Sequence, residues 1–249
     1  AVAAQKTWKQ LSVVQRAEYC TRMVDAFVAD GERIATELTW QMGRPIKYSP
    51  GEIRGFEERS RYMISVAEKS LADIQVGEKA GFTRFIRREP LGVVLVLAPW
   101  NYPYLTSINS IMPALMAGNT VVVKHSTQTP LCAERLADAA AVAGLPPGVF
   151  QYVHASHEDV AKMIDDSRVE FVAFTGSVSG GHAVQRAASD RFVGTGLELG
   201  GKDPAYVRAD VNMAHAVENL VDGSFFNSGQ SCCGIERIYV DQNIFDDFL

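Results

Sequence analysis

The stretch GVVLVLAP (92–99) decides the fold class, because it is a short apolar run that ends abruptly at a proline. Three more runs of this kind follow it: TVVVK (120–124), VFQYV (149–153) and VEFVAF (169–174). Helical patterns lie between and after them, at Leu105–Ala117, Leu131–Ala143, Asp159–Asp166 and Gly181–Ser189. Strands that are apolar on both faces and alternate with helices are typical of a parallel sheet covered on both sides. We therefore predict an α/β fold with an open parallel sheet.

The rest of the chain divides into a helical beginning and a mixed end. Helical patterns are predicted at Ser12–Phe27, Ile34–Met42 and about Ile53–Ile74, and TRFIRREP (83–90) alternates like an exposed or pairing strand. Two further strands are predicted at Ala205–Val207 and Arg237–Val240, beyond the pair Gly200-Gly201. We place a domain boundary at that pair, which gives one domain over 1–199 and the beginning of a second over 200–249. Neither end of the chain carries a helix start or stop signal, so we expect a piece of a longer protein.

Composition narrows the function classes. The 249 residues carry a net charge of −5, which gives no electrostatic reason to expect nucleic acid or an anionic membrane as a partner. No apolar run approaches the roughly 18 residues of a bilayer span, and the first residues lack the layout of a signal peptide. Four cysteines are too few and too poorly spaced for a disulfide framework, which favours the cytoplasm. The five histidines show no ligand spacing, so no metal site is predicted.

Residues that follow the strands are the candidates for binding, because ligands of open parallel sheets lie beyond the carboxyl ends of the strands. FTGSVSGG (174–181) reads as a strand, a glycine turn and a helix start, so Ser177 is either part of an anion site or a plain helix cap. Lys124 ends a buried strand, and it either extends to solvent or meets the hydroxyls or phosphates of a ligand.

The stretch GQSCCGIER (229–237) holds two adjacent cysteines. The pair can be explained as small buried hydrophobes, as half of a metal site, as a chance neighbourhood, or as a site where one of the two is a nucleophile. A thiolate beside a loop or helix terminus can have a lowered pKa and react, which makes Cys232 the candidate nucleophile. Cys233 is predicted to be a packing residue.

Two more residues could take part in chemistry. Glu198 in ELGGKDP (198–204) stands between two leucines at the end of an expected strand. Apolar neighbours would disfavour its charged form and suit a general base or acid, unless its side chain simply points to water. Gly200 and Gly201 suggest close approach of backbone or ligand. Asn101 in PWNYP stands between two prolines that fix the backbone, and a fixed amide suits an oxyanion site.

Together these motifs resemble the aldehyde dehydrogenase superfamily. APWNYP, VVVKHSTQTP, GLPPGVFQ, FTGS with a following glycine pair, LELGGKDP and FFNSGQSCCGIER stand in that family's order. The resemblance implies a Rossmann-like cofactor-binding domain and the start of a catalytic domain. It implies that Cys232 attacks an aldehyde, while the Asn101 amide and the Cys232 backbone N–H hold the oxyanion. Glu198 would activate water, which favours hydrolysis of the thioester to a carboxylic acid over transfer to coenzyme A.

The resemblance also implies an NAD or NADP site. Its residues would be Trp100, Lys124, Thr127, Gly176, Ser177, Gly181 and Leu199. Many NAD-preferring members carry a glutamate where this chain has Thr127, so a 2′-phosphate meets less repulsion beside Lys124. We therefore expect NADP to be tolerated or preferred. His154 stands where the family often has glycine, so we expect a different adenine pocket there.

The resemblance further implies a homodimer or homotetramer in the full-length protein, with about 78–90 in an oligomerisation hairpin. We expect this chain alone to be inactive, and the aldehyde class stays open. One alternative is a semialdehyde or acyl-phosphate reductase of related fold, against which Glu198 argues. The others are a non-catalytic protein that retains the fold and a redox thiol protein, which the lack of a C-x-x-C pair disfavours.

Overall fold

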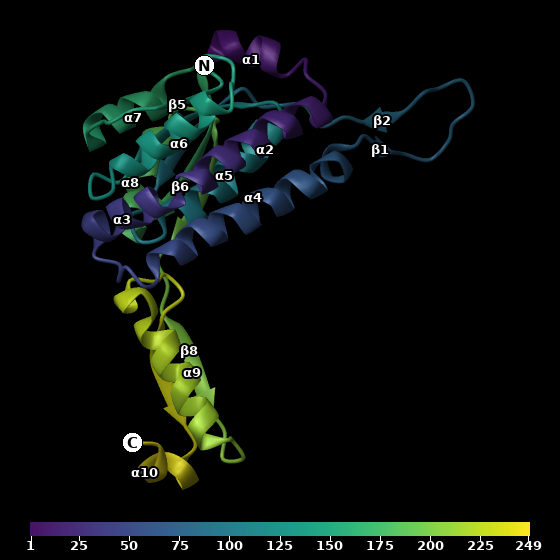
Figure 1. Cartoon of the computed structure of the whole chain (residues 1–249). Coiled ribbons are helices and arrows are strands. Elements are labelled where there is room, and N and C mark those ends of the chain that lie inside the picture. Colours follow the sequence, from purple (N-terminus) through teal and green to yellow (C-terminus); the bar gives the residue numbers. More distant parts are fainter.

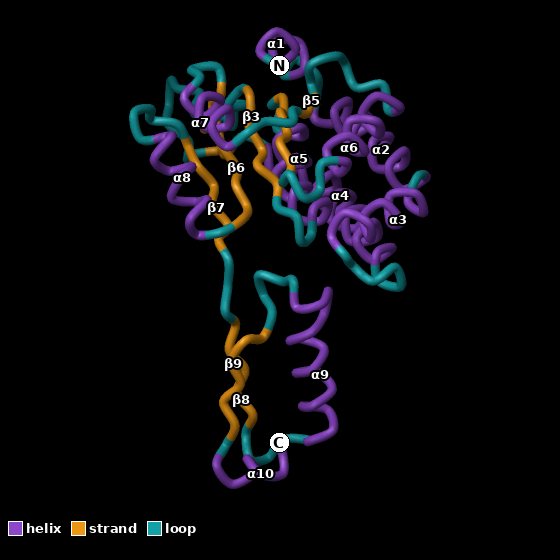
Figure 2. The backbone as a smooth tube through the Cα atoms, turned by 90° about the vertical axis from the view of Figure 1, so that its left-hand side faces the viewer, coloured by secondary structure: helices purple, strands orange, loops and turns teal.

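The computed structural model describes residues 1–249 and divides into a body and an arm (Figure 1). The body holds eight helices and a five-stranded sheet, and a two-stranded ribbon projects from it. The arm follows the last strand of the sheet and extends away from the body (Figure 2). None of the helices combines the length and the apolar composition that crossing a membrane would require.

The sheet confirms the predicted α/β class. Its strands are β3 (Val93–Ala98), β4 (Thr120–His125), β5 (Phe150–Tyr152), β6 (Val169–Gly176) and β7 (Gly194–Leu199). All neighbours pair in parallel, in the order β5-β4-β3-β6-β7. The chain runs outward from β3 in one direction through β4 and β5, then returns to the other side of β3 for β6 and β7. A crevice is therefore expected where β3 and β6 end, because connections leave these neighbours in opposite directions.

Helices cover both faces of the sheet, because its central strands are apolar on both. Val94 and Val96 of β3 belong to a core with the helices α2 to α6, which lie within residues 13–142, whereas Leu95 and Leu97 pack on the other face with α7 (His157–Asp165) and α8 (Val178–Ala188). The helices of the body are α1 (Val2–Trp8), α2 (Val13–Ala29), α3 (Gly31–Met42), α4 (Ser49–Leu71), α5 (Pro103–Met116), α6 (Leu131–Val142), α7 (His157–Asp165) and α8 (Val178–Ala188).

The arm contains both strands predicted beyond the glycine pair. These are β8 (Asp203–Val207) and β9 (Ile235–Val240), which pair in parallel. Between them lie helix α9 (Met213–Phe225) and the 3-10 turn η1 (Phe226–Gly229), and after them η2 (Gln242–Ile244) and α10 (Phe245–Phe248). Gly200 links body and arm with a φ of 62°, a conformation that favours glycine. The assignment of 200–249 to a separate catalytic domain stays a prediction.

Three details differ from the sequence-based expectations. The stretch 194–199 forms a full strand, of which the sequence indicated only the end at Glu198, because two glycines weaken its pattern. Gly194 lies against the ring of Phe171, and a Cβ atom there would lie 3.0 Å from a ring carbon. Helix α4 ends at Leu71, so Ile74 is not helical. It belongs instead to β1 (Ile74–Gln75), which pairs antiparallel with β2 (Phe85–Ile86), and the hairpin therefore starts before residue 78.

Candidate active site

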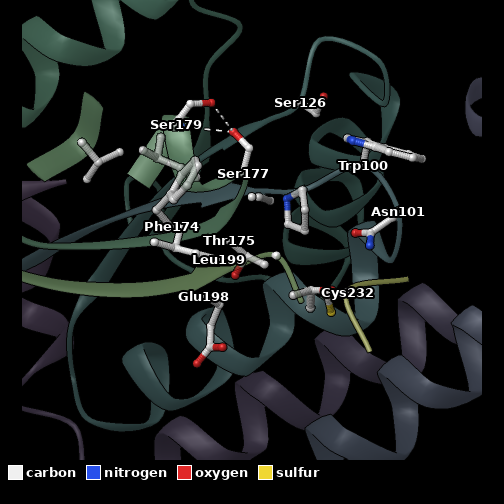
Figure 3. Close-up of a pocket in the computed structure, with 18 of the residues that line it drawn as sticks. Trp100, Asn101, Ser126, Phe174, Thr175, Ser177, Ser179, Glu198, Leu199 and Cys232 are labelled. Carbon is white, nitrogen blue, oxygen red and sulfur yellow. Dashed lines mark hydrogen bonds between the residues drawn. The ribbon is translucent and has the colours of Figure 1, made fainter. Parts of the chain in front are cut away.

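A cavity of about 930 Å³ lies at the carboxyl edge of the sheet, where the arm meets the body. It is lined by every predicted site residue except one: Trp100, Asn101, Lys124, Thr127, Gly176, Ser177, Glu198, Leu199 and Cys232. Figure 3 labels Trp100, Asn101, Ser177, Glu198, Leu199 and Cys232 among them. These residues come from the ends of β3, β4, β6 and β7 and from the loop after η1. The exception is Gly181, which is buried in α8, where a Cβ atom would lie 2.6 Å from a methyl carbon of Leu199.

The loop that carries Cys232 has an unusual backbone. Asn227 and Ser228 have φ angles of 53° and 60°, and they are the only non-glycine residues of the chain with positive φ. Such residues cost free energy and persist only where their surroundings hold them. The amide Nδ2 of Asn227 holds this turn by donating to the carbonyls of Asn101 and Gln230, both at 3.1 Å.

The glycine pair makes the close approach that its sequence predicts. A Cβ atom on Gly201 would overlap the carbonyl oxygen of Cys232, so only glycine fits between the end of β7 and this loop. The linker between body and arm thus packs directly against the backbone of the candidate nucleophile.

The two adjacent cysteines are both exposed, and their sulfur atoms are free thiols. The prediction that Cys233 is a packing residue is wrong, because Cys233 is exposed. Its Sγ lies 3.2 Å from the Ser231 hydroxyl oxygen. The expected lowering of the Cys232 pKa is also wrong. Partial burial, followed by repulsion from Cys233, raises the pKa of Cys232 above its usual value.

Asn101 is held by its own turn and by the arm. Its Oδ1 accepts a hydrogen bond from the Tyr102 N–H at 3.0 Å, and its carbonyl accepts the bond from Asn227. Its Nδ2 group donates to no other residue of the chain, and neither does the backbone N–H of Cys232. Two hydrogen-bond donors are therefore available in one cavity beside the thiol.

Glu198 is exposed, not shielded by the leucines beside it. Successive side chains of a strand point to opposite faces, so Leu197 packs into the core and Glu198 does not follow it. The carboxylate is directed away from Cys232 in this conformation (Figure 3). Glu198 thus lines the cavity without contacting the thiol.

The turn after β6 is a helix cap. The Ser177 Oγ accepts a hydrogen bond from the Gly180 N–H at 3.1 Å and lies 3.0 Å from the Ser179 Oγ. Gly176 and Gly180 are required by packing, since a Cβ atom on either would lie 2.6 Å from Cζ of Phe174. Ser177, Ser179 and Gly180 at the start of α8 line the cavity, so the cap is compatible with an anion site there.

Lys124, near the end of β4, brings a positive charge to the carboxyl edge of the sheet and lines the cavity. The residue is 7% exposed and makes no ion pair, and burial lowers the pKa of its ammonium group. An unpaired cation that lines the same cavity as the first turn of a helix suits a ligand that carries phosphates and hydroxyls. A dinucleotide therefore fits the polar part of the cavity.

An apolar slot between α7 and α8 was missed by the sequence reasoning. Its residues are Val160, Ala161, Ile164, Ala183, Val184 and Ala187. Their helical spacing indicates core packing, and only the packing of the two helices shows that one side of each lines a cavity. His154, where a different adenine pocket was expected, does not line the cavity and instead lies 3.0 Å from Glu134.

The parallel sheet, its switch-point crevice and the exposed cysteine define an α/β protein with a ligand cavity built around a thiol. A family model described as "Aldehyde dehydrogenase family" matches residues 1–249, and the chain belongs to this family. It is 36% identical over 247 residues to succinate-semialdehyde dehydrogenase [NADP(+)] 1 of Mycobacterium tuberculosis, covering 97% of this chain and 53% of that protein.

Solved structures agree with this membership. The structure of PnpE in complex with nicotinamide adenine dinucleotide has a TM-score of 0.95 and 31% identity, covering 100% of this chain and 51% of that one. An NAD-dependent aldehyde dehydrogenase from Sinorhizobium meliloti has a TM-score of 0.92 and 33% identity, covering 99% and 51%. The chain thus spans about half the length of the relatives that it matches.

Proposed function

We propose that the protein containing this chain oxidises an aldehyde to a carboxylic acid with NAD⁺ or NADP⁺. The observation that carries the proposal is the single cavity that holds the exposed thiol of Cys232, the free amide donor of Asn101 and the unpaired cation of Lys124. Family membership supports the reaction class, and the named relatives use both forms of the cofactor.

The cofactor would lie along the edge of the sheet. Lys124 and Thr127 would meet the adenosine ribose, the first turn of α8 the pyrophosphate, and the slot between α7 and α8 the adenine. Trp100, Gly176 and Leu199 would line its path, with Gly181 packed behind Leu199. When bound, NAD(P)⁺ supplies the acceptor for the hydride that leaves the aldehyde carbon. Because no carboxylate stands at Thr127, NADP would be tolerated or preferred.

The thiol chemistry belongs to Cys232. Its sulfur would attack the carbonyl carbon, and the electron pair of the broken π bond would move to oxygen, where Asn101 Nδ2 and the Cys232 N–H donate to it. Loss of hydride would restore the carbonyl and leave a thioester. Water would then attack that carbonyl, lose its proton to Glu198 and release the acid and the Cys232 thiolate.

Glu198 would have to turn to perform this role. Its carboxylate is directed away from Cys232, but the side chain is exposed, so rotation about its own bonds meets no packed core. A base is needed for the first step as well, because the raised pKa of Cys232 leaves little thiolate at neutral pH.

The remaining proposals concern the whole protein. We propose a homodimer or homotetramer in which the β1–β2 ribbon, with exposed Phe85 and Ile86, contacts a second copy. Four unpaired cysteines suit the reducing cytoplasm. Since the chain spans half the length of its relatives, we propose that it does not turn over alone, and NAD(P)H production by the isolated chain would refute this.

The test uses the longest reading frame that contains this chain. NAD⁺ and NADP⁺ reduction is followed across an aldehyde panel that includes succinic semialdehyde, with Cys232→Ala and Cys233→Ala as a matched pair. We expect activity to vanish in Cys232→Ala and to persist in Cys233→Ala. Undiminished oxidation by Cys232→Ala would sink the mechanism, and no oxidation of any aldehyde would sink the function.

A further inference from the structure

Arg44 and Glu52 form an ion pair that is buried far more deeply than the others. Their side chains are 3% and 0% exposed, and Nη1 of Arg44 lies 2.7 Å from Oε2 of Glu52. Neither residue lines the cavity, and the mechanism proposed above uses neither. Arg44 follows the left-handed Gly43 that ends α3, and Glu52 stands in the first turn of α4.

A gain in folding stability does not by itself account for a buried ion pair. Removing two charges from water costs about as much as their attraction returns, and apolar residues of similar volume are often as stable. Here the Nε of Arg44 is also buried without a hydrogen-bond partner, and burial raises the pKa of Glu52. The role of the pair therefore has to be sought in the other groups that Glu52 and Arg44 contact.

Glu52 holds the helix that follows Asn101. Helix α5 has no side-chain cap of its own, and the Oε1 of Glu52 accepts hydrogen bonds from the N–H groups of Tyr104 and Leu105, both at 3.0 Å. A carboxylate at a helix N-terminus satisfies free donors and is favoured by the helix dipole. The turn that carries Asn101 is thus anchored to α4 from outside its own segment.

Arg44 joins this turn to the loop of Cys232. Its guanidinium carbon lies 5.0 Å from the ring centre of Tyr102 and 5.9 Å from that of Phe226. Tyr102 is the neighbour of Asn101, and Phe226 is the neighbour of Asn227, whose amide donates to the Asn101 carbonyl. The Arg44 guanidinium therefore lies beside the neighbours of both residues, Asn101 and Asn227, whose hydrogen bond joins the body to the arm.

We propose that the Arg44–Glu52 pair is a positioning device that sets the Asn101 amide relative to the Cys232 thiol. The expected effect on kcat rests on the proposed function. The expected coupling of segments 101–105 and 226–232 does not, because it can be measured without a substrate.

Arg44→Met and Arg44→Lys test the pair, with Arg135→Gln as a matched control. Arg135 bonds Glu37 at 2.7 Å and joins α6 to α3 without lining the cavity. Lysine keeps the charge opposite Glu52 but loses the planar group that stacks on Tyr102 and Phe226. Because the proposal assigns the positioning to the contacts with Tyr102 and Phe226, we expect Arg44→Lys to show the same defect as Arg44→Met.

Hydrogen exchange of the chain gives the first readout. In both Arg44 variants we expect amide exchange to accelerate about tenfold or more in 101–105 and in 226–232, with β4 within about twofold of wild type. Arg135→Gln should change neither segment. A uniform rise across all segments would mean a purely structural pair, and a rise in 101–105 alone would mean that Arg44 does not reach the Cys232 loop; either result overturns the proposal.

Steady-state kinetics of the longest reading frame give the second readout. Arg44→Met should lower kcat about tenfold or more, with the KM for NAD(P)⁺ within about twofold, because only the reacting groups are displaced. An unchanged kcat would overturn the positioning role. A wild-type protein that oxidises no aldehyde would refute the proposed function instead, and hydrogen exchange would still decide whether the pair joins the two segments.

Discussion

At the scale of single residues, the chemistry of the site depends on two neighbouring thiols. Burial is the larger cause of the raised pKa of Cys232, and the charge of Cys233 adds to it. Cys233→Ala removes only the second cause. The pH midpoint for alkylation of Cys232 by iodoacetamide should therefore fall in this variant but stay above that of free cysteine.

Mass spectrometry of the labelled peptide, with fragmentation to separate the two cysteines, gives this midpoint. Cys20→Ala is a suitable control, because Cys20 is fully buried in the core of the body and should leave the midpoint unchanged. A midpoint that does not respond to Cys233→Ala, or one below that of free cysteine, would contradict this account of the thiols.

At the scale of an element, β4 carries a buried histidine at its end. His125 is 2% exposed, both ring nitrogens lack hydrogen-bond partners, and burial, with smaller contributions from Lys124 and His154, lowers its pKa to about 3 from 6.5. Between about pH 6.5 and pH 3 the imidazole of His125 is protonated in the unfolded chain but stays neutral in the folded chain. The stability from this group is therefore complete above about pH 6.5 and is lost as the pH falls toward 3.

Urea unfolding at pH 7 and pH 5 measures this loss. His125→Leu should remove about 2 kcal/mol of the decrease in unfolding free energy that the wild type shows between these pH values. Replacing the exposed His182 by glutamine should leave the decrease in place. Equal pH dependence in His125→Leu and the wild type would show that His125 is not a buried neutral group.

Elements were predictable from sequence where local patterns were strong. The runs at β3, β4 and β6 are strongly apolar, with Glu170 as the only charged residue inside a run, so the parallel sheet followed from them. For strand β7 the sequence indicated only the end at Glu198, because two glycines weaken the apolar pattern before it, and Gly194 is explained only by the ring of Phe171 in the neighbouring strand. The start of the β1–β2 ribbon was placed too late for a similar reason, since Ile74 continues the apolar spacing of α4 after the helix itself has ended.

At the scale of the whole molecule, the candidate site depends on how the arm meets the body. The strand-end rule gathered Asn101, Lys124 and Ser177 from sequence alone, and local sequence context singled out Cys232 and Glu198. The family resemblance then implied the role of each residue. Neither could predict that Gly201 packs on the Cys232 backbone or that Arg44 lies between Tyr102 and Phe226, because these contacts join segments far apart in the chain. The exposure of Glu198 and of Cys233 was likewise visible only in three dimensions.

The measurement that tests the central claim most directly is the capture of the acyl group on Cys232. The longest reading frame would be mixed with an aldehyde and NAD(P)⁺, quenched in acid and digested for mass spectrometry. The account predicts a cofactor-dependent acyl adduct on Cys232, one that accumulates further in Glu198→Gln, where hydrolysis of the thioester is slowed. Aldehyde oxidation with the acyl group on Cys233, or with no adduct even in Glu198→Gln, would contradict it.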